Sequence, residues 1–145
     1  MTYNYDLGDP GDTFLDHLET AARTVYGEAR GESYDGQSAV ANVIVNRYKN
    51  PGRWGHSLRS VCLKPYQFSC WNSNDPNARK IMQVGFENPM LRQCMKAVIE
   101  ALDSTDDRSY GADHYLVTSL EPKPDWYDES KITVRIGNHT FLKLR

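Results

Sequence analysis

The period at which apolar residues recur changes along the chain, and this change constrains the fold more than any other feature. Apolar residues recur every three or four positions over 14–25, 40–44 and 90–102, which predicts three helices with apolar faces. Apolar and polar residues instead alternate over 131–136, which is typical of a strand with one buried face. The sequence therefore predicts an α+β fold in which helices come first and a small antiparallel sheet comes last.

Residues at the expected helix ends support these boundaries. Gly31 favours the end of the first helix, and Ser33 can cap the start of the second. Asn88-Pro89 combines a capping residue with a proline in the first turn of the third helix. The breaker sequence at 50–52 ends the second helix. The stretch 51–88, rich in Pro, Asn, Ser and Gly, is expected to be mostly irregular with short helical turns, and connections this long are often functional.

The remaining segments complete a single domain. We expect strands at 114–118 and 139–144, with Gly137-Asn138 as the two-residue hairpin turn before the last strand. Residues 1–13 contain closely spaced Gly and Pro, so a flexible lead-in is expected there. The chain has 145 residues, which suits one domain, 14–145, carrying any catalytic site.

Charge and composition exclude several functional classes. Seventeen basic and nineteen acidic residues give a net charge of −2, so the chain lacks the overall basicity that nucleic-acid binding favours. No apolar stretch is long enough for membrane insertion. Residues 1–12 contain three Asp and no Lys or Arg, so we expect no Sec signal peptide and synthesis in the cytoplasm. Cys62, Cys70 and Cys94 are expected to be small buried side chains or free thiols.

Common catalytic and ligand-binding motifs are missing from the sequence. It contains no HExxH or similar metal-ligand spacing, no GxSxG elbow, no P-loop and no GxGxxG. We therefore expect neither a metal nor a cofactor. His114 lies beside Asp113, but neighbours on a strand point to opposite faces, so adjacency alone does not make a catalytic pair.

Glu28 is the strongest candidate for a catalytic acid. It lies near the end of the first predicted helix, in Tyr26-Gly27-Glu28-Ala29-Arg30-Gly31-Glu32. The negative end of the helix dipole, the like charge of Glu32 and partial burial beside Tyr26 would all favour its protonated form. A protonated carboxyl near neutral pH is what general acid catalysis on a glycosidic oxygen requires. A solvated, salt-bridged helix end is the alternative interpretation of these residues.

A second candidate feature is the segment Tyr66-Gln67-Phe68-Ser69-Cys70-Trp71 within the predicted irregular stretch. Its aromatic rings could stack on the apolar faces of sugars, while its amide and hydroxyl groups could bind sugar hydroxyl or N-acetyl groups. The alternative is a loop that is anchored by its own aromatic side chains.

Several segments, in this order, resemble the SleB-type cell wall hydrolases, a family that includes the spore cortex-lytic enzymes. The resemblance covers roughly residues 18–145 and is most specific in its first block. The matching segments are 22–32, 34–37, 39–47, 67–70, 111–115, Trp126 and 136–141.

The resemblance implies a lysozyme-like α+β domain that cleaves peptidoglycan glycan strands between N-acetylmuramic acid and N-acetylglucosamine, as a lytic transglycosylase. It places the key glutamate at Glu28, which would protonate the glycosidic oxygen and then act as a base. The muramic acid 6-hydroxyl would attack its own anomeric carbon and give a 1,6-anhydro sugar. Glu32 is the second catalytic candidate, expected to orient the site or pair with an Arg. The candidates for substrate binding are Tyr26, Gln37, Gln67, Phe68, Ser69, His114, Tyr115 and Trp126.

Two other functions stay open at this point. A hydrolytic muramidase would usually need a second carboxylate, for which Glu32, Asp75 and Asp113 are candidates. A domain without activity could bind only glycan or a protein partner. A metal-dependent amidase or peptidase is disfavoured because the ligand spacing is missing.

The cellular role follows from how the sequence differs from the spore enzymes. No signal peptide and no separate peptidoglycan-binding domain are recognised, which favours a bacteriophage endolysin. We expect synthesis in the host cytoplasm, release that depends on a holin, and action in the periplasm or cell wall after membrane permeabilisation. The expected partner is the peptidoglycan glycan strand, without nucleic acid or membrane insertion, and the expected state is a monomer.

Overall fold

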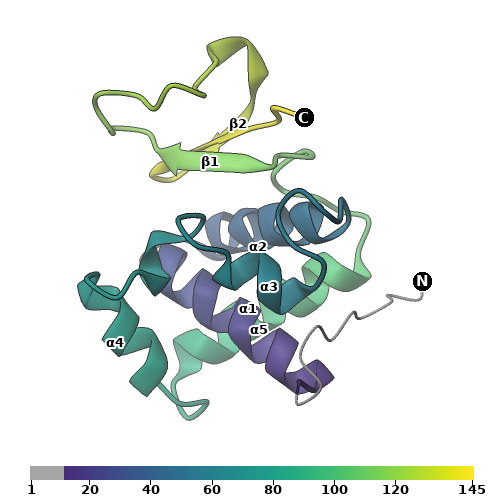
Figure 1. Cartoon of the computed structure of the whole chain (residues 1–145), viewed down its shortest axis with the longest axis vertical. Coiled ribbons are helices and arrows are strands. Elements are labelled where there is room, and N and C mark those ends of the chain that lie inside the picture. Colours follow the sequence, from purple (N-terminus) through teal and green to yellow (C-terminus); the bar gives the residue numbers. More distant parts are fainter. Residues whose placement is uncertain (1–11) are drawn as a thin grey trace.

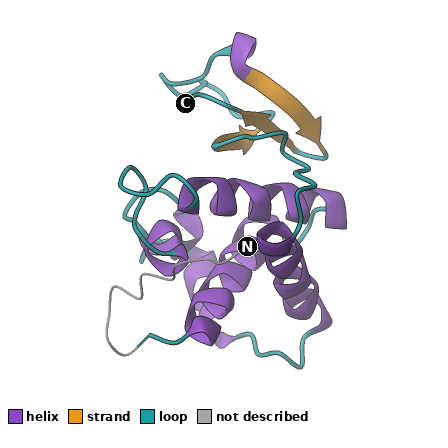
Figure 2. Ribbon diagram, turned by 90° about the vertical axis from the view of Figure 1, so that its right-hand side faces the viewer, coloured by secondary structure: helices purple, strands orange, loops and turns teal. Residues whose placement is uncertain are grey.

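The computed structural model describes residues 12–145. The α-helices precede the strands along the chain, and they form one lobe beneath a small sheet (Figures 1 and 2). This arrangement confirms the predicted α+β class. The elements are α1 (Phe14–Ala29), α2 (Tyr34–Tyr48), α3 (Leu58–Leu63), the 3-10 helix η1 (Ser69–Trp71), α4 (Pro76–Gln83), α5 (Pro89–Asp103), β1 (His114–Val117), the 3-10 helix η2 (Glu129–Lys131), β2 (Ile132–Ile136) and β3 (His139–Leu142).

Two of the predicted helix starts are confirmed by their capping bonds. The Ser33 hydroxyl accepts a hydrogen bond from the backbone N–H of Gly36 at 3.2 Å and caps α2. The Asn88 side chain caps α5 by accepting from the N–H of Met90 at 2.8 Å. Each cap satisfies an N–H group that has no partner within its own helix.

The start of the domain lies slightly earlier than predicted. Thr13 and Asp16 form a reciprocal capping box at the start of α1, and Asp12 forms an ion pair with Arg59 at 2.8 Å. Residues 12 and 13 therefore belong to the folded domain rather than to a lead-in. The rest of the predicted lead-in, residues 1–11, lies outside the described residues.

Helix α2 lies at the centre of the molecule. It packs against α1, α3 and α5 in the helical lobe and against β1 of the sheet, and Figure 1 shows it directly below the strands. Most of its residues are buried, including nearly every position from Gly36 to Tyr48. A helix covered on several sides must place its polar side chains in the interior, where each one needs a partner.

The polar side chains of α2 bind segments that are distant in the sequence. Asn42 accepts from the backbone N–H of Arg108 at 3.0 Å, and Asn46 donates to the Ala112 carbonyl at 2.9 Å. Arg47 donates to the Asp113 carbonyl at 2.8 Å. These bonds fix the connection between α5 and β1, and thereby the place where β1 begins.

The stretch 51–88 is more helical than predicted. It contains α3, η1 and α4, separated by short turns. Helix α3 begins with a capping box between Ser57 and Ser60, and α4 begins at Pro76 behind the capping residue Asp75. Short helices of this kind depend on packing against the rest of the molecule. The Pro, Asn, Ser and Gly content of this stretch therefore did not predict them.

The sheet has the strand order β1-β3-β2, and both pairs are antiparallel. The predicted hairpin is confirmed, because β2 and β3 are joined at Gly137, whose φ of +56° suits glycine. β1 pairs with the other edge of β3, with Tyr115 opposite Phe141. All four residues of β3 are buried, as expected for the central strand of the sheet.

The three cysteines are packed in the interior. Cys62, Cys70 and Cys94 are free and buried, as predicted, and burial raises the pKa of Cys62 and of Cys94 to about 12. They are therefore packed thiols rather than nucleophiles.

Within residues 12–145, no helix combines the length and apolar character needed to cross a membrane.

Candidate active site

A cleft of about 540 Å³ lies where the helical lobe meets the sheet. It is built from the end of α1, one residue of α2, the loop before η1, the first residue of η1, the start of α4, strand β1, the loop after β1 and the start of β3. Its lining residues are Gly27, Glu28, Arg47, Tyr66, Gln67, Ser69, Asn77, Tyr115, Leu116, Val117, Leu120, Pro124, Trp126 and His139. Among the described residues of this lining, Glu28 carries the single carboxylate.

The Glu28 carboxylate receives hydrogen bonds from both lobes. One oxygen accepts from the backbone N–H of Cys70 in η1 at 3.2 Å. The other accepts from the Tyr115 hydroxyl of β1 at 2.5 Å. Glu28 is partly buried in the last turn of α1, so its side chain is held in one orientation while it still faces the cleft.

Tyr115 is protonated throughout the range in which the site would work. Burial raises its pKa well above the usual value, and the nearby charge of Glu28 together with their hydrogen bond raises it further. The phenol therefore remains a hydrogen-bond donor to Glu28 and does not compete with it as an acid near neutral pH.

Gly27 allows η1 to approach α1 closely enough for the Cys70 contact. A Cβ atom at Gly27 would lie 2.8 Å from the Cys70 Cβ and 2.9 Å from a methyl carbon of Ile81. η1 is further anchored by the indole N–H of Trp71, which donates to the Thr24 hydroxyl at 2.8 Å. The glycine before the catalytic candidate thus has a steric role.

Arg47 lines the cleft and holds the side chains around it. Its guanidinium is 5% exposed and lies over the rings of Trp54 and Phe68, 5.4 and 5.2 Å from their centroids. It also donates to the Gln67 side-chain oxygen at 3.3 Å. Arg47 therefore fixes Gln67 at the cleft while it binds the start of β1.

Trp126 gives the cleft an exposed aromatic surface. Its side chain is 38% exposed, and its ring centroid lies 4.9 Å from that of His114. The His114 ring is held in turn by Asp113, with 2.9 Å between Nδ1 and Oδ1. Burial lowers the pKa of His114, although the bond to Asp113 opposes the shift, so this histidine serves better as a packing ring than as a charge at neutral pH.

Glu32 lies outside the cleft lining and binds the turn between β2 and β3. Its carboxylate accepts from the backbone N–H and from the side-chain amide of Asn138, both at 2.9 Å. Glu32 follows the end of α1, so this clamp joins the helix that carries Glu28 to the sheet. Burial alone would raise the pKa of Glu32, but the bonds from Asn138 and the nearby His139 outweigh it and lower the pKa.

The structure brings five of the candidate residues together and leaves the others outside the cleft. Glu28, Gln67, Ser69, Tyr115 and Trp126 all line it, so these five stay candidates for contact with a ligand.

Four of the proposed binding residues do not line the cleft. Gln37 is fully buried and donates to the Ala29 carbonyl at 3.3 Å, and Phe68 is 2% exposed beneath Arg47. Tyr26 packs against the core and carries the Arg30 guanidinium on its ring. His114, which packs against Trp126, is likewise absent from the lining, so the structure holds these four residues in packing contacts outside the cleft lining.

Nine of the lining residues were not among the sequence candidates, and three of these nine, Arg47, Asn77 and His139, have nitrogen-containing polar side chains. Arg47 could have been noticed as a charge on the apolar face of the second predicted helix. Asn77 comes from α4, which the sequence did not predict, and is held by Arg30 at 2.6 Å. His139 is 5% exposed, and burial lowers its pKa despite the charges of Glu32 and Glu28.

The other acidic candidates have structural roles. Asp75 caps α4 by accepting from the N–H of Asn77 at 2.8 Å. Asp113 is 5% exposed and accepts from the N–H groups of Leu144 and Arg145 at 2.9 and 3.0 Å. Neither carboxylate, nor that of Glu32, is placed to face Glu28 across the cleft.

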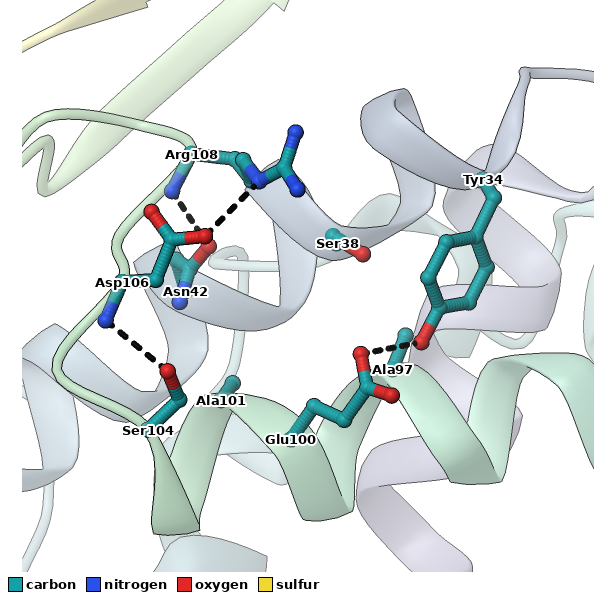
Figure 3. Close-up of a pocket in the computed structure, with 9 residues that line it drawn as sticks. All are labelled: Tyr34, Ser38, Asn42, Ala97, Glu100, Ala101, Ser104, Asp106 and Arg108. Atoms are coloured by element: carbon teal, nitrogen blue, oxygen red, sulfur yellow. Dashed lines mark hydrogen bonds and ion pairs between the residues drawn. The ribbon is translucent and has the colours of Figure 1, made fainter.

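Another pocket lies between α2 and α5 and contains none of the candidate residues (Figure 3). It is smaller, with a volume of about 140 Å³, and the Tyr34 hydroxyl donates to Glu100 at 2.7 Å on its wall. Burial and the bond to Glu100 raise the pKa of Tyr34 to about 12.

Across residues 12–145, no group of three or more His, Cys, Asp or Glu side chains is arranged to hold a metal ion.

Comparison with known families shows to which family the chain belongs. The profile of a family described as "Cell Wall Hydrolase" matches residues 31–142. The chain belongs to the cell wall hydrolase family. The match begins three residues after Glu28, but sequence relatives extend the similarity through that position.

The sequence relatives of this cell wall hydrolase include spore cortex-lytic enzymes. That of Bacillus subtilis (strain 168) is 30% identical over 134 residues, which cover 92% of this chain and 40% of the relative. That of Halalkalibacterium halodurans is 32% identical over 130 residues, which cover 86% of this chain and 34% of the relative. This chain therefore corresponds to less than half the length of these relatives.

Solved structures share the fold of this cell wall hydrolase along nearly its whole length. The catalytic domain of the Bacillus cereus SleB protein has a TM-score of 0.70 at 26% identity, covering 97% of this chain and all of that one. The catalytic domain of the germination-specific lytic transglycosylase SleB from Bacillus anthracis has a TM-score of 0.69 at 27% identity, covering 93% of this chain and 99% of that one. The fold expected from the resemblance is confirmed.

Replacement of Tyr115 by Phe should weaken catalysis without unfolding the protein. The change removes the hydroxyl that donates to Glu28. A hydrogen bond to a charged group contributes about 1.5–3 kcal/mol, so we expect kcat to fall by about 10- to 100-fold. Tyr110→Phe is the matched control, because that side chain is 70% exposed. Rates measured on purified peptidoglycan, with thermal melting for folding, test this; an unchanged rate for Tyr115→Phe would contradict it.

Loss of the Glu32 clamp should destabilise the protein only where Glu32 is charged. We expect Glu32→Gln to lower the free energy of unfolding by about 1–3 kcal/mol at pH 7, since hydrogen bonds to a carboxylate are lost. The pKa of Glu32 is lowered on folding, so its contribution is complete above the unfolded pKa of about 4.3 and is lost as the pH falls through the folded value. The difference from wild type should therefore shrink below about pH 4.

Denaturant unfolding at several pH values measures the Glu32 effect. Glu121→Gln is the control, because the Glu121 side chain is 72% exposed and pairs only with Lys123 at the surface. Exposed pairs of this kind contribute little. A stability difference for Glu32→Gln that stays constant from pH 7 to pH 3 would show that the clamp does not depend on the charge.

Proposed function

We propose that this cell wall hydrolase cleaves the glycan strands of peptidoglycan as a lytic transglycosylase, with Glu28 as both acid and base. The observation that carries the proposal is the single carboxylate in the described cleft lining, placed between donors from both lobes. Family membership and similarity to a catalytic domain called a lytic transglycosylase support the same reaction class.

In the first step, Glu28 gives its proton to the oxygen that bridges two sugars. The bond to the anomeric carbon then breaks through a state that resembles an oxocarbenium ion. The carboxylate left on Glu28 is stabilised by the N–H of Cys70 and the hydroxyl of Tyr115. Both donors are held by the fold before the reaction, so little reorganisation is needed as the charge develops.

In the second step, the Glu28 carboxylate accepts the proton of the muramic acid 6-hydroxyl. The hydroxyl oxygen attacks the anomeric carbon of the same sugar, and the product is a 1,6-anhydro ring. Glu28 regains its proton, no water is consumed, and no second carboxylate is required. This chemistry fits a cleft whose described lining has one carboxylate, since Glu32, Asp75 and Asp113 lie outside that lining and accept structural hydrogen bonds.

The lining of the cleft suits a polysaccharide. Trp126 offers a partly exposed ring, and Val117 and Leu120 add exposed apolar surface, each at 46%. Gln67, Ser69 and Asn77 place amide and hydroxyl groups along the same cleft. Rings that stack on sugar faces, beside polar groups that bind hydroxyl and N-acetyl groups, are what recognition of a glycan strand requires.

The decisive experiment is mass spectrometry of the fragments that wild type and Glu28→Gln release from purified peptidoglycan. We expect wild type to release anhydro-muropeptides, which are lighter by one water than reducing ones. Glu28→Gln should release them at least about 100-fold more slowly, because general acid–base catalysis contributes this much or more. The control Glu129→Gln, at an exposed position, should behave as wild type.

Other products would select one of the alternatives. Reducing muramic acid ends would indicate a hydrolytic muramidase that positions a water molecule. If folded wild type released no fragments while it still bound peptidoglycan, the chain would be a glycan-binding domain. Near-normal activity of Glu28→Gln would overturn the assignment of Glu28.

We also propose that the protein acts as an endolysin, which reaches the cell wall only after a holin has permeabilised the membrane. When the chain is expressed in a bacterium whose wall it cleaves, culture turbidity should fall only after chloroform permeabilises the membrane. The Glu28→Gln variant should cause no fall under either condition. Lysis without chloroform would contradict dependence on permeabilisation.

A further inference from the structure

A third cavity, rich in cations, is connected to the cleft by a row of packed rings. Its volume is about 420 Å³, and Trp54 forms part of its surface. Four basic side chains line it: Lys49, Arg53, Lys143 and Arg145. All four residues are exposed. This clustering of basic residues is local, since the chain as a whole has a net charge of −2.

Among residues 12–145, none of these four cations forms an ion pair with an acidic side chain. The ion pairs among the described residues involve other basic side chains. Asp113 is the one acidic residue among the described lining, and it is 5% exposed, with its oxygens bound by backbone N–H groups of Leu144 and Arg145. The four basic side chains outnumber the carboxylates at the pocket, so its net charge is positive and would attract an anionic group.

A row of rings connects this pocket to the cleft. Trp126 lines the cleft and its centroid lies 4.9 Å from that of His114. The His114 centroid lies 6.3 Å from that of Trp54, which lines the cationic pocket. Arg47 lines the cleft and stacks on the same Trp54 ring at 5.4 Å. The cleft and the cationic pocket therefore lie on either side of one packed group of rings, and a ligand that extends along the surface beyond Trp126 would come close to the cationic pocket.

We propose that the pocket formed by Lys49, Arg53, Lys143 and Arg145 binds carboxylate groups of the peptide stem that hangs from the glycan strand. This inference rests on the proposed function, since a strand in the cleft would bring its stems to the neighbouring surface. Muramic acid carries the stem on its lactyl group, and the stem has free carboxylates. The cleft would then read the sugar and the adjoining pocket would read the peptide.

Binding of the stem alone tests the pocket separately from catalysis. The probe is the synthetic tripeptide L-alanyl-γ-D-glutamyl-L-lysine, titrated into the whole ¹⁵N-labelled protein at low salt. The indole N–H resonance of Trp54 should shift with the tripeptide and stay unchanged with its fully amidated form at the same concentration. Because the attraction is ionic, the response should weaken as salt is raised.

Two matched variants separate pocket charge from total charge. Arg53→Gln combined with Lys143→Gln removes two cations of the pocket, and Lys80→Gln combined with Arg135→Gln removes two exposed cations elsewhere. We expect the first pair to weaken tripeptide binding by about 10-fold, or about threefold for each charge. The second pair should bind as wild type. The proposal would be overturned if both double variants lost tripeptide binding equally, or if neither lost any.

Kinetics on two glycans then link the pocket to the reaction. One substrate is peptidoglycan freed of wall polymers, and the other is the same glycan after an amidase has removed the stems. The pocket variant should show a KM raised by about 10-fold on the first substrate, an unchanged kcat, and an unchanged rate on the second. A loss of rate that is equal on both substrates would contradict a role in stem recognition.

The outcomes distinguish the possible failures. If wild type releases no fragments from either glycan, the proposed function fails, while the tripeptide titration still decides whether the pocket binds stem carboxylates. If poly(glycerol phosphate) shifts the Trp54 resonance and the tripeptide does not, the pocket binds a phosphate polymer and the proposal is overturned.

Discussion

The burial of α2 between the helical lobe and the sheet is the constraint on which the rest of the structure depends. A helix buried in this way can carry polar side chains only if each one is satisfied by another segment. Asn42, Asn46 and Arg47 meet this requirement by binding the chain between Arg108 and Asp113. The interior polar groups of α2 thus specify where the sheet begins relative to the helices.

The position of the sheet in turn completes the site. Tyr115 lies one residue after the start of β1, and its hydroxyl meets the Glu28 carboxylate that extends from the end of α1. The Glu32 clamp on Asn138 holds the opposite end of the sheet against the same helix. Glu28 therefore receives its donors only when both lobes are correctly docked, so the geometry of the acid depends on tertiary packing of the whole domain.

Charge is distributed unevenly around this arrangement. The described cleft lining has one carboxylate and the buried Arg47, and the pocket that Trp54 lines has four basic side chains without an ion pair among residues 12–145. Such a division suits a substrate whose backbone is a neutral sugar polymer and whose branches carry carboxylates. The net charge of the chain gives no sign of it, because acidic residues elsewhere offset these cations.

The sequence by itself determined the class of fold, three main helices and the β2–β3 hairpin, because periodicity, capping residues and a turn dipeptide are local signals. It also singled out Glu28 as a candidate catalytic acid. It did not determine α4, which depends on packing, and it could not separate Gln67, which lines the cleft, from Phe68, which lies beneath Arg47. It suggested that Glu32 acts on Glu28 through its charge, whereas the fold directs Glu32 to Asn138, 106 residues away in the chain. Tertiary structure decided these points because the partners of Glu28, Glu32 and Arg47 come from segments that approach one another only when the sheet docks on α2.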